Sequence, residues 1–292
     1  MLKKILITGG NGLLGQSLRL MLSKQYEIIA TGLNSDRLKN HNHTYTSLDV
    51  SIMKDCENIL VQFMPDVVIN TAAITDVDYC ELNKKKCLNI NALSINTFLS
   101  YCKKYNKKFI HLSTDFLFDG KLGPYHENEE CNPINYYGFS KMKAENLIIN
   151  TKLKNFSIIR TCLVYGKKID SNNIFMWVKK KLEKGEALNI VDDQYRTPTL
   201  YSDLSQAIFE IIKLDLKGIY NISGGEYLSI FDFVCKIVSI FDFDKSLVKR
   251  CNSDKINQKA QRPKKSGLLI DKAIKDFNYL PTKMEVYLKS IK

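Results

Sequence analysis

The chain has 292 residues, of which 45% are apolar and 25% charged, a mixture typical of soluble globular proteins with one or two domains. No apolar run reaches the roughly 18 residues of a membrane helix, and Lys3-Lys4 leads into a strand rather than a signal peptide, so we expect a cytoplasmic protein without a membrane partner. The 43 basic and 31 acidic residues give a net charge of +12. The basic residues are scattered, which favours a solvated lysine-rich surface rather than a nucleic-acid-binding site. Part of this charge could attract an anionic nucleotide substrate.

The first predicted elements are a strand, a glycine-rich turn and a helix. Residues 3–8 form an apolar strand, Gly9, Gly10, Gly12 and Gly15 follow, and an apolar-periodic helix comes next. The spacing fits Gly-x-Gly-x-x-Gly and equally Gly-x-x-Gly-x-x-Gly, in which glycines let the backbone approach a pyrophosphate and the helix start binds the anion. In this setting the pattern predicts a dinucleotide site rather than an empty tight turn.

The second predicted strand, residues 27–31, bears on which dinucleotide is bound. A carboxylate near its end would accept hydrogen bonds from the adenosine ribose and repel a 2′-phosphate, but Gly32 occupies that place. Arg37 follows in the loop and can bind a 2′-phosphate, although Asp36 lies beside it. We therefore favour NADPH over NADH, the alternative being that Arg37 is an ordinary exposed cation.

Strands and helices alternate through residue 160, and the strands are almost continuously apolar. This alternation predicts an α/β fold, a doubly wound parallel sheet of Rossmann type with helices on both faces. Further strands are expected at 44–48, 66–70, 108–112 and 157–160, and helices at 51–63, 82–105 and 136–150.

Beyond residue 160 the pattern loosens, with helices expected at 172–182, 204–213 and 229–241 and a strand at 218–222. We expect residues 1–165, rejoined by about 200–223, to form the dinucleotide-binding domain, and residues 166–199 and 224–292 to form a smaller C-terminal substrate lobe. The eight cysteines include no Cys-x-x-Cys pair, so we interpret them as buried small hydrophobes. No cluster of ligand residues predicts a metal site.

Polar residues follow several predicted strands, at the edge where a parallel sheet binds ligands. Asn70 ends one strand and opens a loop of small residues, and Ser113 and Thr114 follow another. Tyr137 and Lys141 share one face of a predicted helix, with Cβ atoms roughly 5–6 Å apart. We expect the lysine to lower the tyrosine pKa from about 10 and so create a general acid. The alternatives are turn or capping roles for Asn70 and Thr114. For Tyr137 and Lys141 the alternative is a solvated surface pair.

These motifs resemble those of the extended short-chain dehydrogenase/reductases, and within them most of all the dTDP-4-dehydrorhamnose reductase family. The resemblance runs from Leu2 to about Ala273, whereas epimerases and dehydratases share only the glycine turn and the Tyr-x-x-x-Lys. The matching segments are 8–15, 49–50, 70–78, 113–120, 137–141, 160–165, 172–173, 193–195 and 197–199.

The resemblance implies an oxidoreductase that uses NADPH or NADH to reduce the 4-keto group of a nucleotide-activated deoxysugar, in dTDP-L-rhamnose and surface polysaccharide biosynthesis. It implies three catalytic residues: Tyr137 donates the proton, Lys141 also bonds the nicotinamide ribose, and Thr114 orients the carbonyl. It also leaves room for a homodimer. Cofactor contacts are expected for Gly9, Asn11, Gly12, Leu13, Leu14, Gly15, Arg37, Asp49, Val50, Ala72, Ala73, Thr75, Ser113, Tyr137 and Lys141.

Departures from the family pattern cluster on the sugar side. Leu163 stands where the family has a tryptophan that packs on the sugar, Phe116 replaces a tyrosine, and Arg196 is unusual beside the Pro-Thr pair. Arg196 is either an exposed loop cation or a clamp on a substrate phosphate. Substrate contacts are expected for Asp115, Phe116, Leu163, Asn173 and Arg196.

Two other functions remain open on the same fold. An epimerase or dehydratase would hold NAD tightly and consume none of it overall. A non-catalytic regulatory subunit would bind dinucleotide and a protein partner without turnover, although the catalytic residue types are all present in this chain.

Overall fold

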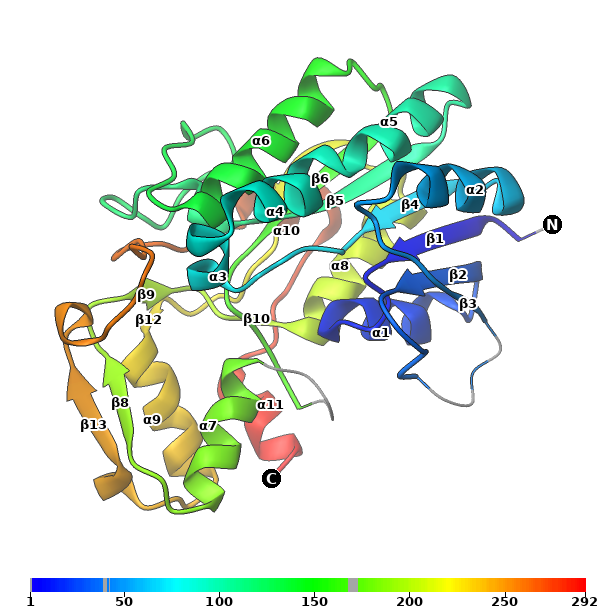
Figure 1. Cartoon of the computed structure of the whole chain (residues 1–292). Coiled ribbons are helices and arrows are strands. Elements are labelled where there is room, and N and C mark those ends of the chain that lie inside the picture. Colours follow the sequence, from blue (N-terminus) through cyan, green and yellow to red (C-terminus); the bar gives the residue numbers. More distant parts are fainter. Residues whose placement is uncertain (1, 39–40, 42, 168–172) are drawn as a thin grey trace.

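The computed structural model describes residues 2–38, 41, 43–167 and 173–292, and its centre is a seven-stranded parallel sheet (Figure 1). The strands are β1 (Lys4–Thr8), β2 (Glu27–Gly32), β3 (Thr44–Ser47), β4 (Val67–Asn70), β5 (Lys108–Thr114), β6 (Phe156–Thr161) and β11 (Gly218–Asn221). They lie in the order β11-β6-β5-β4-β1-β2-β3. From β1 the chain adds β2 and β3 on one side and then β4, β5, β6 and β11 on the other, so the strand order reverses between β1 and β4. In an open α/β sheet, ligands bind at such a reversal, beyond the carboxyl ends of the strands.

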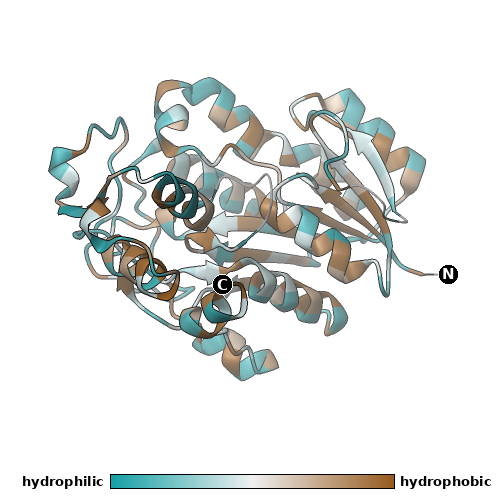
Figure 2. Cartoon of the chain, turned by 90° about the horizontal axis from the view of Figure 1, so that it is seen from below, coloured by the Kyte–Doolittle hydropathy of each residue, from teal (hydrophilic) through white to brown (hydrophobic). Residues whose placement is uncertain are grey.

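Two apolar layers cover the sheet because successive strand residues point to opposite faces. Ile5 and Ile7 of β1 belong to one buried cluster, whereas Leu6 between them belongs to another. Figure 2 shows the brown hydrophobic strands lying between helices that are part teal and part brown. The helices with side chains in the first cluster are α1 (Leu13–Leu22), α8 (Tyr201–Lys213) and α10 (Asp271–Phe277), and those in the second are α2 (Met53–Phe63), α5 (Ile95–Lys104) and α6 (Tyr136–Asn150).

The predicted strands and the 136–150 helix are confirmed, but the predicted 82–105 helix is wrong as a single element. The chain instead forms α3 (Val77–Leu82), α4 (Lys84–Leu88), the π-helical turn η1 (Asn89–Leu93) and then α5. Asn83 separates α3 from α4 because its backbone (φ −126°, ψ 53°) is not helical. Asn91 in the π-turn is buried. Its Oδ1 accepts from the Ile74 backbone nitrogen, and its Nδ2 donates to the Ile74 carbonyl oxygen and to the Ser140 hydroxyl.

In the described residues, a smaller lobe contains three two-stranded sheets and three α-helices, with its own apolar core (Figure 1). Its elements are β7 (Val164–Tyr165), β8 (Leu188–Val191), β9 (Tyr195–Arg196), β10 (Thr199–Leu200), β12 (Leu228–Ser229), β13 (Val248–Cys251), α7 (Ile174–Glu183), α9 (Ile230–Ile240) and α11 (Met284–Ser290). Between two passes through the lobe, the chain returns to the main sheet through α8 and β11. Residue 172 of the predicted 172–182 helix lies outside the described residues.

The lobe's role in binding substrate stays a prediction.

Within the described part of the chain, no helix has the length and apolar character needed to cross a membrane.

Candidate active site

The glycine turn lies at the carboxyl end of β1, and the loop after β4 passes directly over it. Gly9 has a φ of +69°, and a Cβ there would lie 2.8 Å from the Ala72 backbone nitrogen. A Cβ on Gly15 would lie 2.3 Å from the Gly9 carbonyl oxygen. Gly12 caps α1, and the first turn of that helix carries no acidic side chain. The predicted strand, turn and helix are confirmed, and the start of α1 offers bare N–H groups to an anion.

The loop after β2 is held against the glycine turn by Asn11. Its side-chain nitrogen donates to the carbonyl oxygens of Leu33 and Ser35 at 3.2 and 3.0 Å, and its Oδ1 accepts from the Arg37 backbone nitrogen at 3.0 Å. The Arg37 side chain is exposed in this loop. Asn11 therefore links the predicted pyrophosphate and 2′-phosphate subsites.

Asp36 lies next to Arg37, but its carboxylate is bound by a different arginine. Arg19, fully buried on α1, donates to Asp36 Oδ1 and Oδ2 at 2.8 and 2.5 Å. Burial alone would raise the pKa of Asp36, but these hydrogen bonds lower it overall, so the carboxylate stays charged and paired. This pair was not predictable from the sequence, because Arg19 lies within an apolar-periodic helix. Asp36 is consequently not a free charge that would repel a 2′-phosphate.

The remaining predicted cofactor residues follow β3 and β4. Asp49 accepts from the backbone nitrogen and hydroxyl of Ser51 at 2.9 and 2.7 Å, next to the buried Val50. Ala72 and Ala73 are partly buried in the loop after β4, and Thr75 of the same loop is exposed. Asn91 anchors this loop to α6 through Ile74 and Ser140. Asn91 is not among the site residues predicted from the sequence. An asparagine within a segment that is expected to be an apolar helix is the signal that could have revealed its buried amide.

Thr114, Tyr137 and Lys141 are brought together because α6 starts directly on the turn that follows β5. Thr114 ends β5, and its Oγ1 accepts from the Phe116 backbone nitrogen at 3.2 Å, so the predicted capping role is present. The Phe116 ring meets the Tyr137 ring edge-on, with centroids 5.9 Å apart. Thr114 Oγ1 also donates to Asp115 Oδ1 at 3.2 Å, beside the Tyr137 phenol. Ser113, the predicted cofactor contact beside them, is buried on β5.

The expected lowering of the Tyr137 pKa by Lys141 is wrong. Burial raises the pKa of Tyr137 well above its ordinary value, the Thr114 hydrogen bond offsets only part of this rise, and the nearby Asp115 carboxylate adds to it. Lys141 is itself buried, and burial lowers its pKa to about 8. Desolvation is therefore the largest influence on the Tyr137 pKa. Tyr137 is a protonated phenol at neutral pH, which is the form that donates a proton.

Replacing Gly138 by Ala is expected to lower both stability and turnover. A Cβ at Gly138 would lie 2.1 Å from the Phe116 carbonyl oxygen, so α6 and the turn beneath it would have to separate. Overpacking of this kind costs about 1–3 kcal/mol, and it moves Tyr137 away from Thr114. Urea unfolding and steady-state kinetics measure the two effects. Gly225→Ala is the control, since a Cβ there only touches Pro281 at 3.4 Å; wild-type behaviour of Gly138→Ala would contradict this packing.

On the sugar side, Arg196 is buried rather than an exposed loop cation, so that alternative is wrong. It is 3% exposed, its Nε lies 3.7 Å from Asp115 Oδ2, and its guanidinium lies 5.2 Å from the Phe116 ring centroid. The Ser266 hydroxyl also donates to Asp115. Phe116 is thus in contact with both Arg196 and Tyr137. The Phe116 ring therefore packs against Tyr137, the predicted catalytic residue.

The other predicted substrate residues, Leu163 and Asn173, are distant in sequence from Asp115 and Phe116. Leu163 has a φ of +40° and packs on a small cluster that includes Leu117 and Phe118. Asn173 is the N-cap of α7, where its Oδ1 accepts from the backbone nitrogens of Phe175 and Met176 at 3.1 and 3.3 Å. Asn172, which the resemblance includes, lies outside the described residues.

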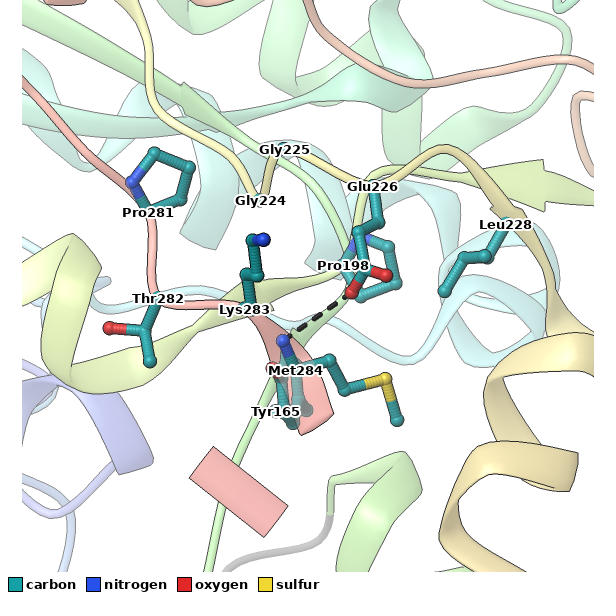
Figure 3. A pocket seen from close by; sticks show the side chains of 10 residues that line it. All are labelled: Tyr165, Pro198, Gly224, Gly225, Glu226, Leu228, Pro281, Thr282, Lys283 and Met284. Carbon is teal, nitrogen blue, oxygen red and sulfur yellow. Dashed lines mark hydrogen bonds between the residues drawn. The ribbon is translucent and has the colours of Figure 1, made fainter. Parts of the chain in front are cut away.

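A cavity of about 190 Å³ lies where the lobe meets the chain leading into α11, and the predicted site residues do not line it (Figure 3). Glu226 Oε2 accepts from the Met284 backbone nitrogen across it at 3.4 Å. Ligand pockets are usually about 300–1,000 Å³, so this cavity is small for a nucleotide sugar. Its lining residues are Tyr165, Pro198, Gly224, Gly225, Glu226, Leu228, Pro281, Thr282, Lys283 and Met284.

Comparison with known proteins matches residues 3–291 to the family described as RmlD substrate binding domain. A dTDP-4-dehydrorhamnose reductase of Aggregatibacter actinomycetemcomitans is 28% identical over 99% of this chain and 98% of that protein. The crystal structure of dTDP-4-dehydrorhamnose reductase from Bacillus anthracis in complex with NADP has a TM-score of 0.88 and 27% identity, covering 99% of this chain and 98% of that one. Methionine adenosyltransferase 2 subunit beta of Danio rerio is 25% identical over 91% of this chain and 82% of that protein.

Proposed function

The chain belongs to the RmlD substrate binding domain family, and from this premise we propose that it reduces the 4-keto group of a nucleotide-activated deoxysugar with NADPH. Its relatives include dTDP-4-dehydrorhamnose reductases, so the proposed product is dTDP-L-rhamnose for polysaccharide biosynthesis. The observation that carries the proposal is the placement of Thr114, Tyr137 and Lys141 at the sheet edge that also holds the glycine turn.

The residues around the glycine turn fit a dinucleotide. Side chains at Gly9 or Gly15 would collide with backbone atoms, so the turn is compact. The first N–H groups of α1 have no carbonyl partner within the helix. The absence of an acidic residue from the first turn of α1 leaves its positive end available to a pyrophosphate. Arg37, held by Asn11, would take the 2′-phosphate because the neighbouring Asp36 is neutralised by Arg19.

When bound, the reduced nicotinamide supplies a hydride to the carbonyl carbon of the substrate. Tyr137, protonated because burial raises its pKa, donates its proton to the carbonyl oxygen. The Thr114 hydroxyl orients the same oxygen, and the Lys141 ammonium stabilises the phenolate that forms. General acid catalysis contributes about 10²–10⁴-fold, and positioning of the reactants supplies the remaining acceleration.

Arg37→Gln is expected to raise the KM for NADPH about tenfold and to leave the KM for NADH unchanged. A hydrogen bond to a charged group is worth about 1.5–3 kcal/mol, and only NADPH carries the 2′-phosphate that Arg37 would bind. Lys54→Gln, which removes a cation that is 78% exposed, is the control. An equal effect of Arg37→Gln on both dinucleotides would contradict the assignment.

The function is tested by following nicotinamide absorbance with NADPH or NADH against dTDP-4-keto-6-deoxy sugars and their UDP counterparts. The proposal predicts NADPH oxidation that matches the sugar reduced. An epimerase or dehydratase would convert the sugar without net oxidation of the dinucleotide.

A second candidate is a subunit that binds dinucleotide without turnover, which the similarity to methionine adenosyltransferase 2 subunit beta favours. Such a subunit would bind NADPH and a partner protein but reduce none of these sugars. The presence of Thr114, Tyr137 and Lys141 in one place supports the reductase instead.

A further inference from the structure

A series of polar side chains runs beneath the proposed active site, from the glycine turn to the catalytic lysine. Lys141 Nζ lies 3.3 Å from His111 Nε2, and His111 Nδ1 lies 3.1 Å from Asn70 Nδ2. Asn70 Oδ1 in turn accepts from the Thr8 hydroxyl at 2.5 Å. The strand register sets this order, because Thr8 pairs with Asn70 and Asn70 pairs with His111.

His111 has no role in the reaction as described so far, although it is completely enclosed. Its exposed fraction is 0%, that of Asn70 is 1% and that of Lys141 is 3%. The Phe109 ring stacks near the imidazole, with centroids 6.2 Å apart. A buried polar ring is costly unless its nitrogens are hydrogen-bonded. The contacts to Lys141 and Asn70 therefore fix how the ring is oriented and protonated.

The other groups near Lys141 are less suited to hold its amine. Glu145 lies one turn further along α6, but its Oε1 and Oε2 accept from Arg160 at 3.1 and 2.7 Å. The Cys80 thiol is a weak acceptor. The Cys87 sulfur, whose pKa is lowered by its hydrogen bond with Cys80, already accepts from Asn91 Nδ2 at 3.4 Å. The titratable and charged groups around Lys141 are His111 from β5, Arg160 from β6, Cys80 from α3, Cys87 from α4, and Tyr137 and Glu145 from α6.

Donors and acceptors in this series match in two ways, one for each charge state of Lys141. An ammonium has only donors, so it needs an unprotonated His111 Nε2; the ring proton then lies on Nδ1 and must face the Asn70 amide oxygen. A neutral amine can accept from a protonated Nε2, while Nδ1 accepts from the Asn70 amide nitrogen and Thr8 donates to Oδ1. The two arrangements differ by a histidine tautomer and a half-turn of one amide.

We propose that His111 is a positioning residue that holds Lys141 in both charge states by changing its tautomer as Lys141 gains or loses a proton. The proposal rests on the proposed reduction, in which Lys141 stabilises the Tyr137 phenolate. Burial and the Lys141 charge hold the pKa of His111 well below its ordinary value, so the imidazole stays neutral. Burial lowers the pKa of Lys141 to about 8, so both of its charge states are reached near neutral pH.

The direct test is nitrogen NMR of histidine-labelled wild-type protein through the titration of Lys141. The chain has four histidines, and the spectrum of His111→Gln identifies the His111 signals by their loss. We expect the ring proton to move from Nδ1 to Nε2 as the pH rises through about 8, and to stay in place in Lys141→Met. A wild-type ring that keeps one tautomer, or that becomes imidazolium, contradicts the proposal. The measurement needs no turnover, so its outcome is independent of the proposed function.

A kinetic test separates positioning from a merely structural role. His111→Leu removes a hydrogen bond from both charge states of Lys141, but the bond to the ammonium is the stronger, so the lysine pKa falls and kcat declines at a lower pH than in the wild type. The difference between a charged and a neutral hydrogen bond is worth a factor of about ten, so this alkaline decline is expected to move by about one pH unit. His111→Gln supplies an amide oxygen and is expected to restore the profile. An unmoved decline in His111→Leu would overturn the proposal, and if that variant fails to fold, the wild-type spectrum decides.

Discussion

Tyr137→Phe is expected to lower kcat about 10²–10⁴-fold, the usual contribution of a general acid, while NADPH binding stays near the wild-type level. The variant loses only the phenolic hydroxyl, and the ring that meets Phe116 edge-on at 5.9 Å is kept. The glycine turn and the loop after β2, which the account assigns to the dinucleotide, are untouched. Calorimetric titration measures NADPH binding, and nicotinamide absorbance measures turnover.

Tyr136→Phe is the matched control for this experiment. Tyr136 is the preceding residue on α6, and its ring packs on Phe139 at 5.4 Å rather than on Phe116. Its hydroxyl has no part in the proposed chemistry, so turnover is expected to persist. Turnover of Tyr137→Phe at the wild-type rate would remove the proposed acid from the reaction.

Glu145→Gln is expected to lower the free energy of unfolding by about 3–5 kcal/mol, because it leaves the Arg160 charge buried without its partner. The side chains of Arg160 and Glu145 are 4% and 3% exposed, and the guanidinium donates to both carboxylate oxygens. Its third contact, from Nη1 to the Glu127 carbonyl oxygen at 2.9 Å, carries no compensating charge.

Urea unfolding of Glu145→Gln measures this loss, with Glu57→Gln as the control. Glu57 faces Lys54 at 3.6 Å on the surface, with side chains that are 47% and 78% exposed. Exposed pairs of this kind add little because water screens them. A Glu145→Gln variant as stable as Glu57→Gln would show that the buried pair does not hold β6 to α6.

Elements whose patterns are local were predictable from the sequence. The glycine turn between β1 and α1 follows from spacing alone, and the predicted 136–150 helix has the same ends as α6. The convergence of Thr8, Asn70 and Thr114 at one sheet edge follows from the rule that parallel strands end together. These inferences needed no knowledge of how distant side chains pack.

Features that depend on burial were not predictable in the same way. The lysine four residues from Tyr137 suggested a lowered phenol pKa, but desolvation in the folded chain reverses the direction. The break at Asn83 lies in a segment whose composition suits one long helix. Arg196 resembles a loop cation in the sequence, and only the tertiary structure encloses it between Asp115 and Phe116.

In the proposed reaction a protonated Tyr137 completes the reduction of a 4-keto sugar by NADPH, and a single assay decides whether it does. Purified protein is mixed with NADPH and dTDP-4-keto-6-deoxy sugar, and nicotinamide absorbance and sugar product are followed together for wild type and Tyr137→Phe. We expect one NADPH to be oxidised for each sugar reduced by the wild type, and almost none by the variant. Sugar conversion without net NADPH oxidation, or equal rates for the two proteins, would contradict it.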